Sequence, residues 1–87
     1  MPHYLLEAPH SNEECVRALD DLAEKEPGLL EQSWFGCKAG EHTEWATVEA
    51  TNEADARNML PEFLREKAHV VEVSKFSPGE VRAMHQR

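Results

Sequence analysis

The alternation of apolar and polar residues divides the first half of the chain into a strand, a helix and two further strands. Residues 3–8 (HYLLEA) are short and apolar-rich, which predicts a strand that ends at Pro9. Residues 11–28 predict a helix that starts with a Ser-x-x-Glu capping box and stops at a Pro-Gly pair. Residues 29–37 and 42–50, on either side of the polar turn KAGE, predict the next two strands. In the predicted helix over residues 11–28, apolar residues recur at helical spacing at Cys15, Val16, Leu19, Leu22 and Ala23.

The second half of the chain predicts another helix, a fourth strand and a short helical tail. Residues 51–68 have helical spacing, but Pro61 should kink this helix or split it after Leu60, because proline lacks the amide hydrogen and clashes with the preceding turn. Residues 69–76 predict the fourth strand, and 77–87 begin with the Ser-Pro-Gly-Glu pattern of a capped helix. The apolar face of the second helix comprises Ala56, Met59, Leu60, Phe63 and Leu64.

The resulting order, β-α-β-β-α-β with a helical tail, predicts a single ferredoxin-like α+β domain over residues 1–87. Right-handed crossovers make the first strand parallel to the second, with the third strand between them and the fourth outside the first. Both helices then cover one face of an antiparallel four-stranded sheet. An uncovered face with aromatic and aliphatic side chains predicts a homodimer formed through the sheet. We expect that face to carry Trp45, Thr47, Glu49, Leu5, Glu7, Val70 and Glu72.

Composition narrows the classes of partner. Nine Lys and Arg residues stand against 17 Asp and Glu, and the net charge of −8 argues against nucleic acid and anionic membrane surfaces. No apolar run approaches the ~18 residues that span a bilayer, and the start MPHYLLEAPH lacks the features of a signal peptide. We therefore expect a cytoplasmic protein with two free thiols, a Cys15–Cys37 disulfide being the alternative.

Cysteine and histidine residues gather at one edge of the predicted sheet. The first two strands end there, near His10 and Cys37, and the third and fourth strands begin there, near His42 and His69. The first helix also starts at this edge with Cys15, which we interpret as a core thiol because free cysteine is usually buried. The predicted topology thus brings residues that are far apart in sequence to a common edge.

Thiolate and imidazole groups together suit Zn²⁺, Ni²⁺ or Cu²⁺, whereas Ca²⁺ and Mg²⁺ prefer oxygen ligands. A small protein that binds a divalent transition metal, and is not an enzyme, is therefore the first functional hypothesis. The spacing Cys37-x4-His42 matches no established metal motif, and each residue could instead pack at a strand end or cap a turn. The predicted ligands are His10, Cys37 and His42, with His69 as a further ligand and Glu41 or Glu44 in a direct or supporting role.

The segments GEHTEWATVEATNEADARNMLP and HVVEVSKFSPGEVRAMH resemble small bacterial proteins with a dimeric ferredoxin-like fold, among them small nickel-binding ferredoxin-like proteins. The resemblance lies in the layout: a strand that begins with Thr after a polar turn, an Ala-rich helix start and a closing Ser-Pro helix. It implies a homodimer with metal ligands at strand ends. The chain is also similar to the dimeric α+β barrel proteins, some of which are monooxygenases or haem-handling enzymes. It is shorter than the nickel-binding group, and its first strand leads directly into the first helix.

Two other functions stay open at this point. A dimeric α+β barrel enzyme or small-molecule binder would enclose a cavity of about 300 Å³ or more between two sheets, lined by Glu7, Trp45 and Val70. An acidic interaction subunit would present its charged surface to a basic partner. A nucleophile pair of Cys37 with His42 or with His10 is a further catalytic option, although so short a chain shows no oxyanion hole.

Overall fold

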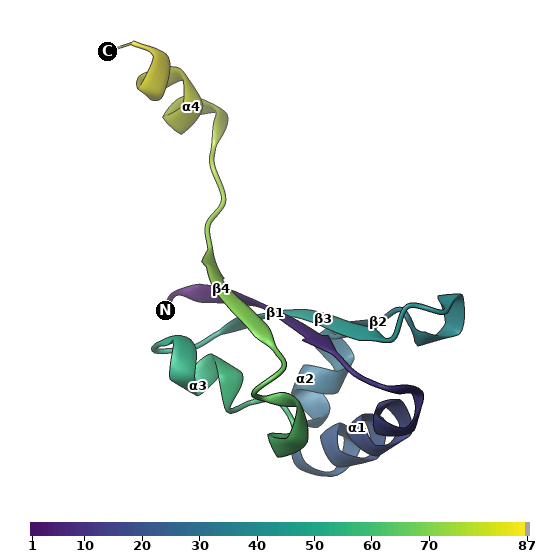
Figure 1. The fold of residues 1–87 in the computed structure, drawn as a ribbon. Helices are drawn as coiled ribbons and strands as arrows, with labels where there is room; N and C mark the ends of the chain where they lie inside the picture. Colours follow the sequence, from purple (N-terminus) through teal and green to yellow (C-terminus); the bar gives the residue numbers. More distant parts are fainter. Residues whose placement is uncertain (87) are drawn as a thin grey trace.

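Four strands form one antiparallel sheet in which β3 lies between β1 and β2 (Figure 1). The structure is a computed structural model that describes residues 1–86, and Arg87 lies outside the described residues. The strand order β2-β3-β1-β4 confirms the predicted places of the third and fourth strands. The strands are β1 (His3–Pro9), β2 (Trp34–Phe35), β3 (Thr43–Glu49) and β4 (His69–Val73).

The helices α1, α2 and α3 lie on the same face of the sheet, which we call the covered face (Figure 1). The opposite side of the sheet is called the open face. The C-terminal helix α4 stands apart from the rest of the chain. Across residues 1–86, no helix is both long and apolar enough to cross a membrane. The helices are α1 (Asn12–Lys25), α2 (Pro27–Gln32), α3 (Glu53–Arg57) and α4 (Pro78–His85), with 3₁₀ turns η1 (Cys37–Ala39) and η2 (Glu62–Leu64).

The prediction of a strand over residues 29–37 is wrong for most of its length. The first helix, α1, does end just before the Pro-Gly pair, at Lys25, but Pro27 then begins the short helix α2, because its fixed φ suits the first helical position. The following Leu-Leu-Glu-Gln residues are good helix formers, and Leu29 is buried against the sheet. Only Trp34 and Phe35 then pair with β3.

Alternation along β1 and β3 builds the core. Every second residue of these strands faces the helices, and Leu6 at the centre of β1 is fully buried. The second helical segment is interrupted before Pro61, as predicted, but α3 already ends at Arg57, and the helical structure resumes only in η2. Leu60 and Leu64 both reach the core. The main buried apolar residues are Tyr4, Leu6, Ala8, Ala18, Leu22, Leu29, Ala46, Val48, Ala50, Ala56, Leu60, Leu64, Ala68 and Val70.

Two predicted faces differ from the structure. On α1 the buried side chains are those of Cys15, Ala18 and Leu22, while the predicted core residues Val16, Leu19 and Ala23 are exposed. On β4 the predicted assignment of residues to the two faces is shifted by one residue. The register pairs Val70 with Leu6 and Glu72 with Tyr4, which places Val70 and Glu72 on the covered face. Val71 and Val73 take the open face instead.

Candidate metal centre

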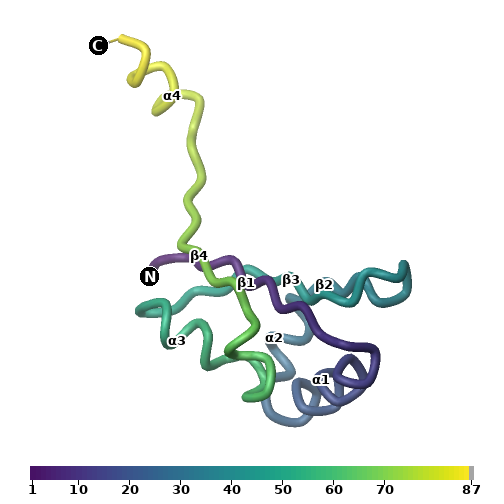
Figure 2. The backbone as a smooth tube through the Cα atoms, viewed as in Figure 1, coloured from purple at the N-terminus to yellow at the C-terminus, as the bar shows by residue number. Residues whose placement is uncertain are grey.

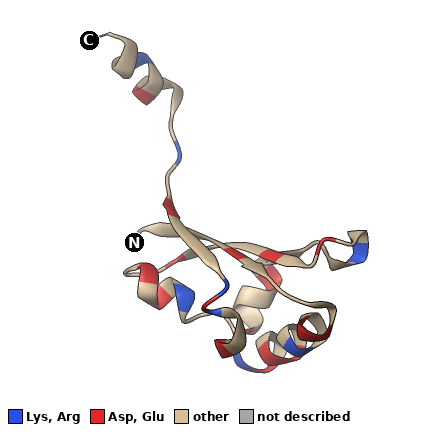
Figure 3. Cartoon of the chain, in the orientation of Figure 1, with Lys and Arg blue, Asp and Glu red and all other residues tan. Residues whose placement is uncertain are grey.

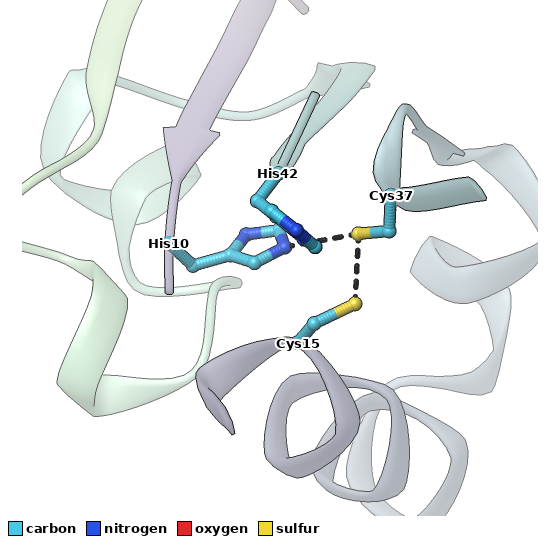
Figure 4. A group of neighbouring side chains, drawn as sticks. All are labelled: His10, Cys15, Cys37 and His42. Carbon is cyan, nitrogen blue, oxygen red and sulfur yellow. Dashed lines mark hydrogen bonds between the residues drawn. The ribbon is translucent and has the colours of Figure 1, made fainter. Parts of the chain in front are cut away.

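Four residues from four places in the fold bring their donor atoms together at one edge of the sheet. One ligand atom each from His10, Cys15, Cys37 and His42 lies within 4.8 Å of the other three. Figure 4 shows the four side chains pointing toward one another from the end of β1, the start of α1, the turn after β2 and the start of β3. The predicted grouping of His10, Cys37 and His42 is therefore present, and Cys15 joins it.

The two histidines are placed by the pairing of β1 with β3. The last assigned pair is Pro9 with Thr43, and the His10 amide donates to the His42 carbonyl oxygen at 3.0 Å, which continues the same register by one more pair. Because side chains alternate along a strand, His10 follows Ala8 onto the covered face. The two imidazole rings are consequently neighbours, with centroids 6.3 Å apart.

Cys37 is positioned by the turn that joins β2 to β3. The Gly36 amide donates to the Thr43 carbonyl at 3.1 Å, and the Glu41 amide donates back to the Gly36 carbonyl at 2.9 Å. Between these bonds Cys37 begins a 3₁₀ turn that Gly40 closes with a φ of 92°, a left-handed conformation that favours glycine. The turn therefore directs the Cys37 thiol back over the end of the sheet.

Cys15 is positioned by the capped start of α1. The Ser11 side chain accepts a hydrogen bond from the Glu14 amide, and the Glu14 side chain accepts one from the Ser11 amide, so the predicted capping box is present. The Cys15 amide donates to the Ser11 carbonyl at 3.0 Å. Lys67 binds both carboxylate oxygens of Glu14, at 2.6 and 2.8 Å, and so links the start of α1 to the segment before β4.

The histidines carry the strongest chemical sign of a ligand. Nδ1 of His10 donates to the Ala8 carbonyl at 3.0 Å, which fixes the tautomer and leaves the lone pair on Nε2. That Nε2 atom lies 3.3 Å from Sγ of Cys37. Metal-binding histidines commonly orient their second nitrogen in this way. Nδ1 of His42 is buried and has no hydrogen-bond partner among residues 1–86, although buried polar atoms rarely lack one.

The two cysteines are free thiols whose sulfur atoms lie 2.7 Å apart. This separation is longer than the ~2.05 Å bond of a disulfide. Burial, and to a smaller extent hydrogen bonding and charge from the neighbouring Cys37 thiol, together raise the pKa of Cys15 to about 11. A buried thiolate here therefore needs a cation to stabilise it.

Three other predicted ligands stand outside this group. His69 pairs with Glu7 and is exposed on the open face, so the sheet separates its ring from the four donors. Glu41 is exposed and accepts a hydrogen bond from the Thr43 hydroxyl at 3.4 Å. Glu44 is fully buried on the covered face, where the Ser33 hydroxyl lies 2.7 Å from one carboxylate oxygen. The other oxygen lacks a partner among the described residues, and burial raises the pKa of Glu44.

Cys15 is the ligand candidate that sequence reasoning assigned to the core. It lies on the apolar stripe of α1, and a buried thiol on such a stripe usually only packs. A second sign was nevertheless available in the sequence. Four residues separate His10 from Cys15, and four residues separate Cys37 from His42, so a histidine–cysteine pair recurs in reverse order.

Comparisons with known proteins add no relative from which a function could be transferred. No protein-family model matches the chain, and no curated protein or solved structure is significantly similar to it. The functional conclusion therefore depends on the geometry and chemistry of the four-residue group.

Proposed function

We propose that the chain binds one divalent transition metal ion, with Zn²⁺ as the best fit, through two thiolates and two imidazoles. The observation that carries this proposal is the convergence of four donor atoms within 4.8 Å of one another. Two sulfur and two nitrogen donors are a common ligand set of structural zinc sites. The proposed ligands are His10, Cys15, Cys37 and His42.

The distances are close to those a tetrahedral zinc site requires. Zn–S bonds of ~2.3 Å and Zn–N bonds of ~2.0–2.1 Å place neighbouring ligand atoms about 3.3–3.8 Å apart. The 3.3 Å between His10 Nε2 and Cys37 Sγ meets this requirement. The 2.7 Å between the two sulfur atoms is shorter, so the thiolates would separate by about 1 Å to admit the ion. Such a movement is small for side chains on a helix terminus and a turn.

Charge supports the same ion class. Two thiolates balance the charge of a divalent cation, while the two histidines bind as neutral groups. His10 is already held as the Nδ1–H tautomer that leaves Nε2 free to bind. Ni²⁺ and Cu²⁺ accept the same donors, and the resemblance to nickel-binding proteins keeps Ni²⁺ as the first competitor.

Four protein ligands favour a structural or storage role over catalysis. Catalytic zinc sites keep an open position for water or substrate, whereas structural sites are closed. An ion at this position would join the end of β1, the start of α1 and the β2–β3 turn. The proposed cavity enzyme has less support, because Val70 lies in the core and Glu7 already accepts a hydrogen bond from Trp45 Nε1 at 3.1 Å.

The fold and the cellular setting are part of the same proposal. The element order and the sheet order β2-β3-β1-β4 support a ferredoxin-like domain. The ligand thiols must stay reduced to bind metal, which favours a reducing compartment such as the cytoplasm. Both cysteines being free agrees with such a setting.

Native mass spectrometry of reduced, chelator-treated protein tests the proposal. After addition of Zn²⁺ or Ni²⁺ in separate samples, we expect one ion per chain, with Zn²⁺ displacing Ni²⁺ in competition. Cys37→Ser and His42→Ala should each lose the ion. His69→Ala and His3→Ala are matched controls that remove an exposed histidine elsewhere and should bind as the unchanged protein does. Equal uptake by a Cys37→Ser/His42→Ala double variant would rule out this site.

A further inference from the structure

A C-terminal segment extends away from the domain with its apolar side chains uncovered. Residues 74–86, which we call the arm, leave the end of β4 on the side of the sheet opposite the helices (Figures 1 and 2). Phe76, Val81 and Met84 are 66%, 42% and 61% exposed. Three large apolar side chains on thirteen solvent-exposed residues indicate a segment that packs on another surface.

Local sequence signals favour a helix in the arm, although the arm has no hydrophobic core of its own. Ser77 and Glu80 form a reciprocal capping box, and Pro78 occupies the first helical position. An isolated helix of eight residues is nevertheless marginal in water, because the first turn is costly to form and few bonds follow. Packing against a partner surface would supply the missing stabilisation.

The open face of the sheet is the second uncovered apolar surface. Val71 and Val73 of β4 lie there beside Leu5 of β1, and Trp34 of β2 is 79% exposed next to Trp45 of β3. A cavity of about 320 Å³ lies at one end of this face, where the arm begins. Its lining residues are His3, Thr47, Val73, Ser74 and Lys75.

The arm and the remainder of the chain have opposite charge. Residues 74–86 carry two basic side chains, Lys75 and Arg82, and one acidic side chain, Glu80. Residues 1–73 carry 16 acidic and six basic side chains. Figure 3 shows acidic positions spread over the strands and helices, while the arm carries basic positions on its extended part and on α4, where one acidic position lies beside them. Charge therefore favours contact between an arm and the body of a chain.

We propose that two copies of this chain form a two-fold dimer in which each arm packs across the open face of the partner. Two-fold symmetry makes the contact reciprocal, so both uncovered surfaces of both copies are buried by one arrangement. Phe76 and the apolar side chains of α4 would cover the valine, leucine and tryptophan side chains of the open face. This dimer goes beyond the proposed metal binding, because the four ligands lie on the covered face.

Oligomeric state measured on the full chain tests the dimer. By sedimentation equilibrium the unchanged protein should have twice the mass of the 9.9 kDa chain. Phe76→Ser/Met84→Ser in the arm and Val71→Lys on the open face should each raise the dimer dissociation constant about tenfold or more. Val16→Ser, which changes a valine 62% exposed on α1, is the matched control and should leave the dissociation constant unchanged.

A mixing experiment separates exchange of arms from other arrangements. The arm variant keeps an intact open face, and the Val71→Lys variant keeps an intact arm. An equimolar mixture should therefore form heterodimers with one intact contact, at concentrations where each variant alone is monomeric. A monomeric wild type, or a dimer that neither variant weakens, would overturn the proposal. So would a monomer whose tryptophan fluorescence depends on Phe76, since that result means that the arm folds back on its own sheet.

Discussion

The sulfur atoms of Cys15 and Cys37 lie 2.7 Å apart although the residues are 22 positions apart in sequence. One belongs to the first turns of α1 and the other to the turn that follows β2. A metal ion bound between them would fasten the helix to the turn, and His10 and His42 would fasten both to the sheet. The metal site is therefore expected to affect folding stability as well as ligand binding.

Zn²⁺ should stabilise the folded chain strongly. An ion that binds only the folded state at a free concentration 1,000 times its dissociation constant adds about 4 kcal/mol to the free energy of unfolding. For a domain of this size that corresponds to a rise in Tm of ~15 °C or more. Calorimetry with and without Zn²⁺ measures the shift, and EDTA should reverse it. The Cys37→Ser variant should show no shift, and a similar shift in that variant would contradict the assignment.

Metal affinity should rise with pH. The ligand thiols bind metal as thiolates, and burial together with the neighbouring Cys37 thiol raises the pKa of Cys15 to about 11. Binding therefore releases at least the Cys15 proton, so the apparent association constant should increase by about tenfold or more per pH unit between pH 7 and 8. Competition against a chromophoric chelator at several pH values measures the slope. An affinity independent of pH across this range would mean that the thiols are not the ligands.

Gly36→Ala should weaken metal binding although it removes no ligand. A Cβ atom at this position would lie 2.5 Å from the Glu41 carbonyl oxygen, a backbone atom that cannot move without the turn. The displaced turn would carry Cys37 away from His10, and we expect a loss of affinity of about tenfold or more. Isothermal titration with Zn²⁺ measures it. Gly28→Ala is the control, since its Cβ would meet no atom within 4 Å, and it should bind normally.

The Glu14–Lys67 pair should make part of the stability sensitive to acid. Hydrogen bonds from the Lys67 ammonium and the Ser11 amide lower the pKa of Glu14 from its ordinary 4.5 to about 2. Because the pKa is lower in the folded state, the contribution is fully present above pH 4.5 and is lost as the pH falls toward 2. Glu14→Gln should therefore reduce the urea midpoint at pH 7 but bring little further change at pH 2.5. Glu13→Gln, an exposed acid in the same turn, should leave the pH dependence as in the unchanged protein.

Local sequence signals determined most of the architecture. Both capping boxes, the split at Pro61 and the alternation along β1 and β3 depend on neighbouring residues, and the structure contains each of them. The order of strands also followed, because the handedness of the crossovers leaves few arrangements. The convergence of His10, Cys37 and His42 was predictable from that order alone.

Only the tertiary structure decided which side chains share a face where the pattern was ambiguous. Apolar residues at Val70, Val71 and Val73 fit either register of an edge strand, and only pairing with β1 sends Val70 inward and His69 outward. Likewise, the apolar spacing along α1, taken alone, indicates that Cys15 is a core residue. It becomes the fourth candidate ligand because packing of α1 beneath the sheet brings its thiol to the Cys37 turn. The sequence by itself thus determined most helices and strands and the sheet edge at which the ligand candidates meet. Long-range packing decided which side chains point their donor atoms toward one another, because that direction depends on contacts that local spacing does not encode.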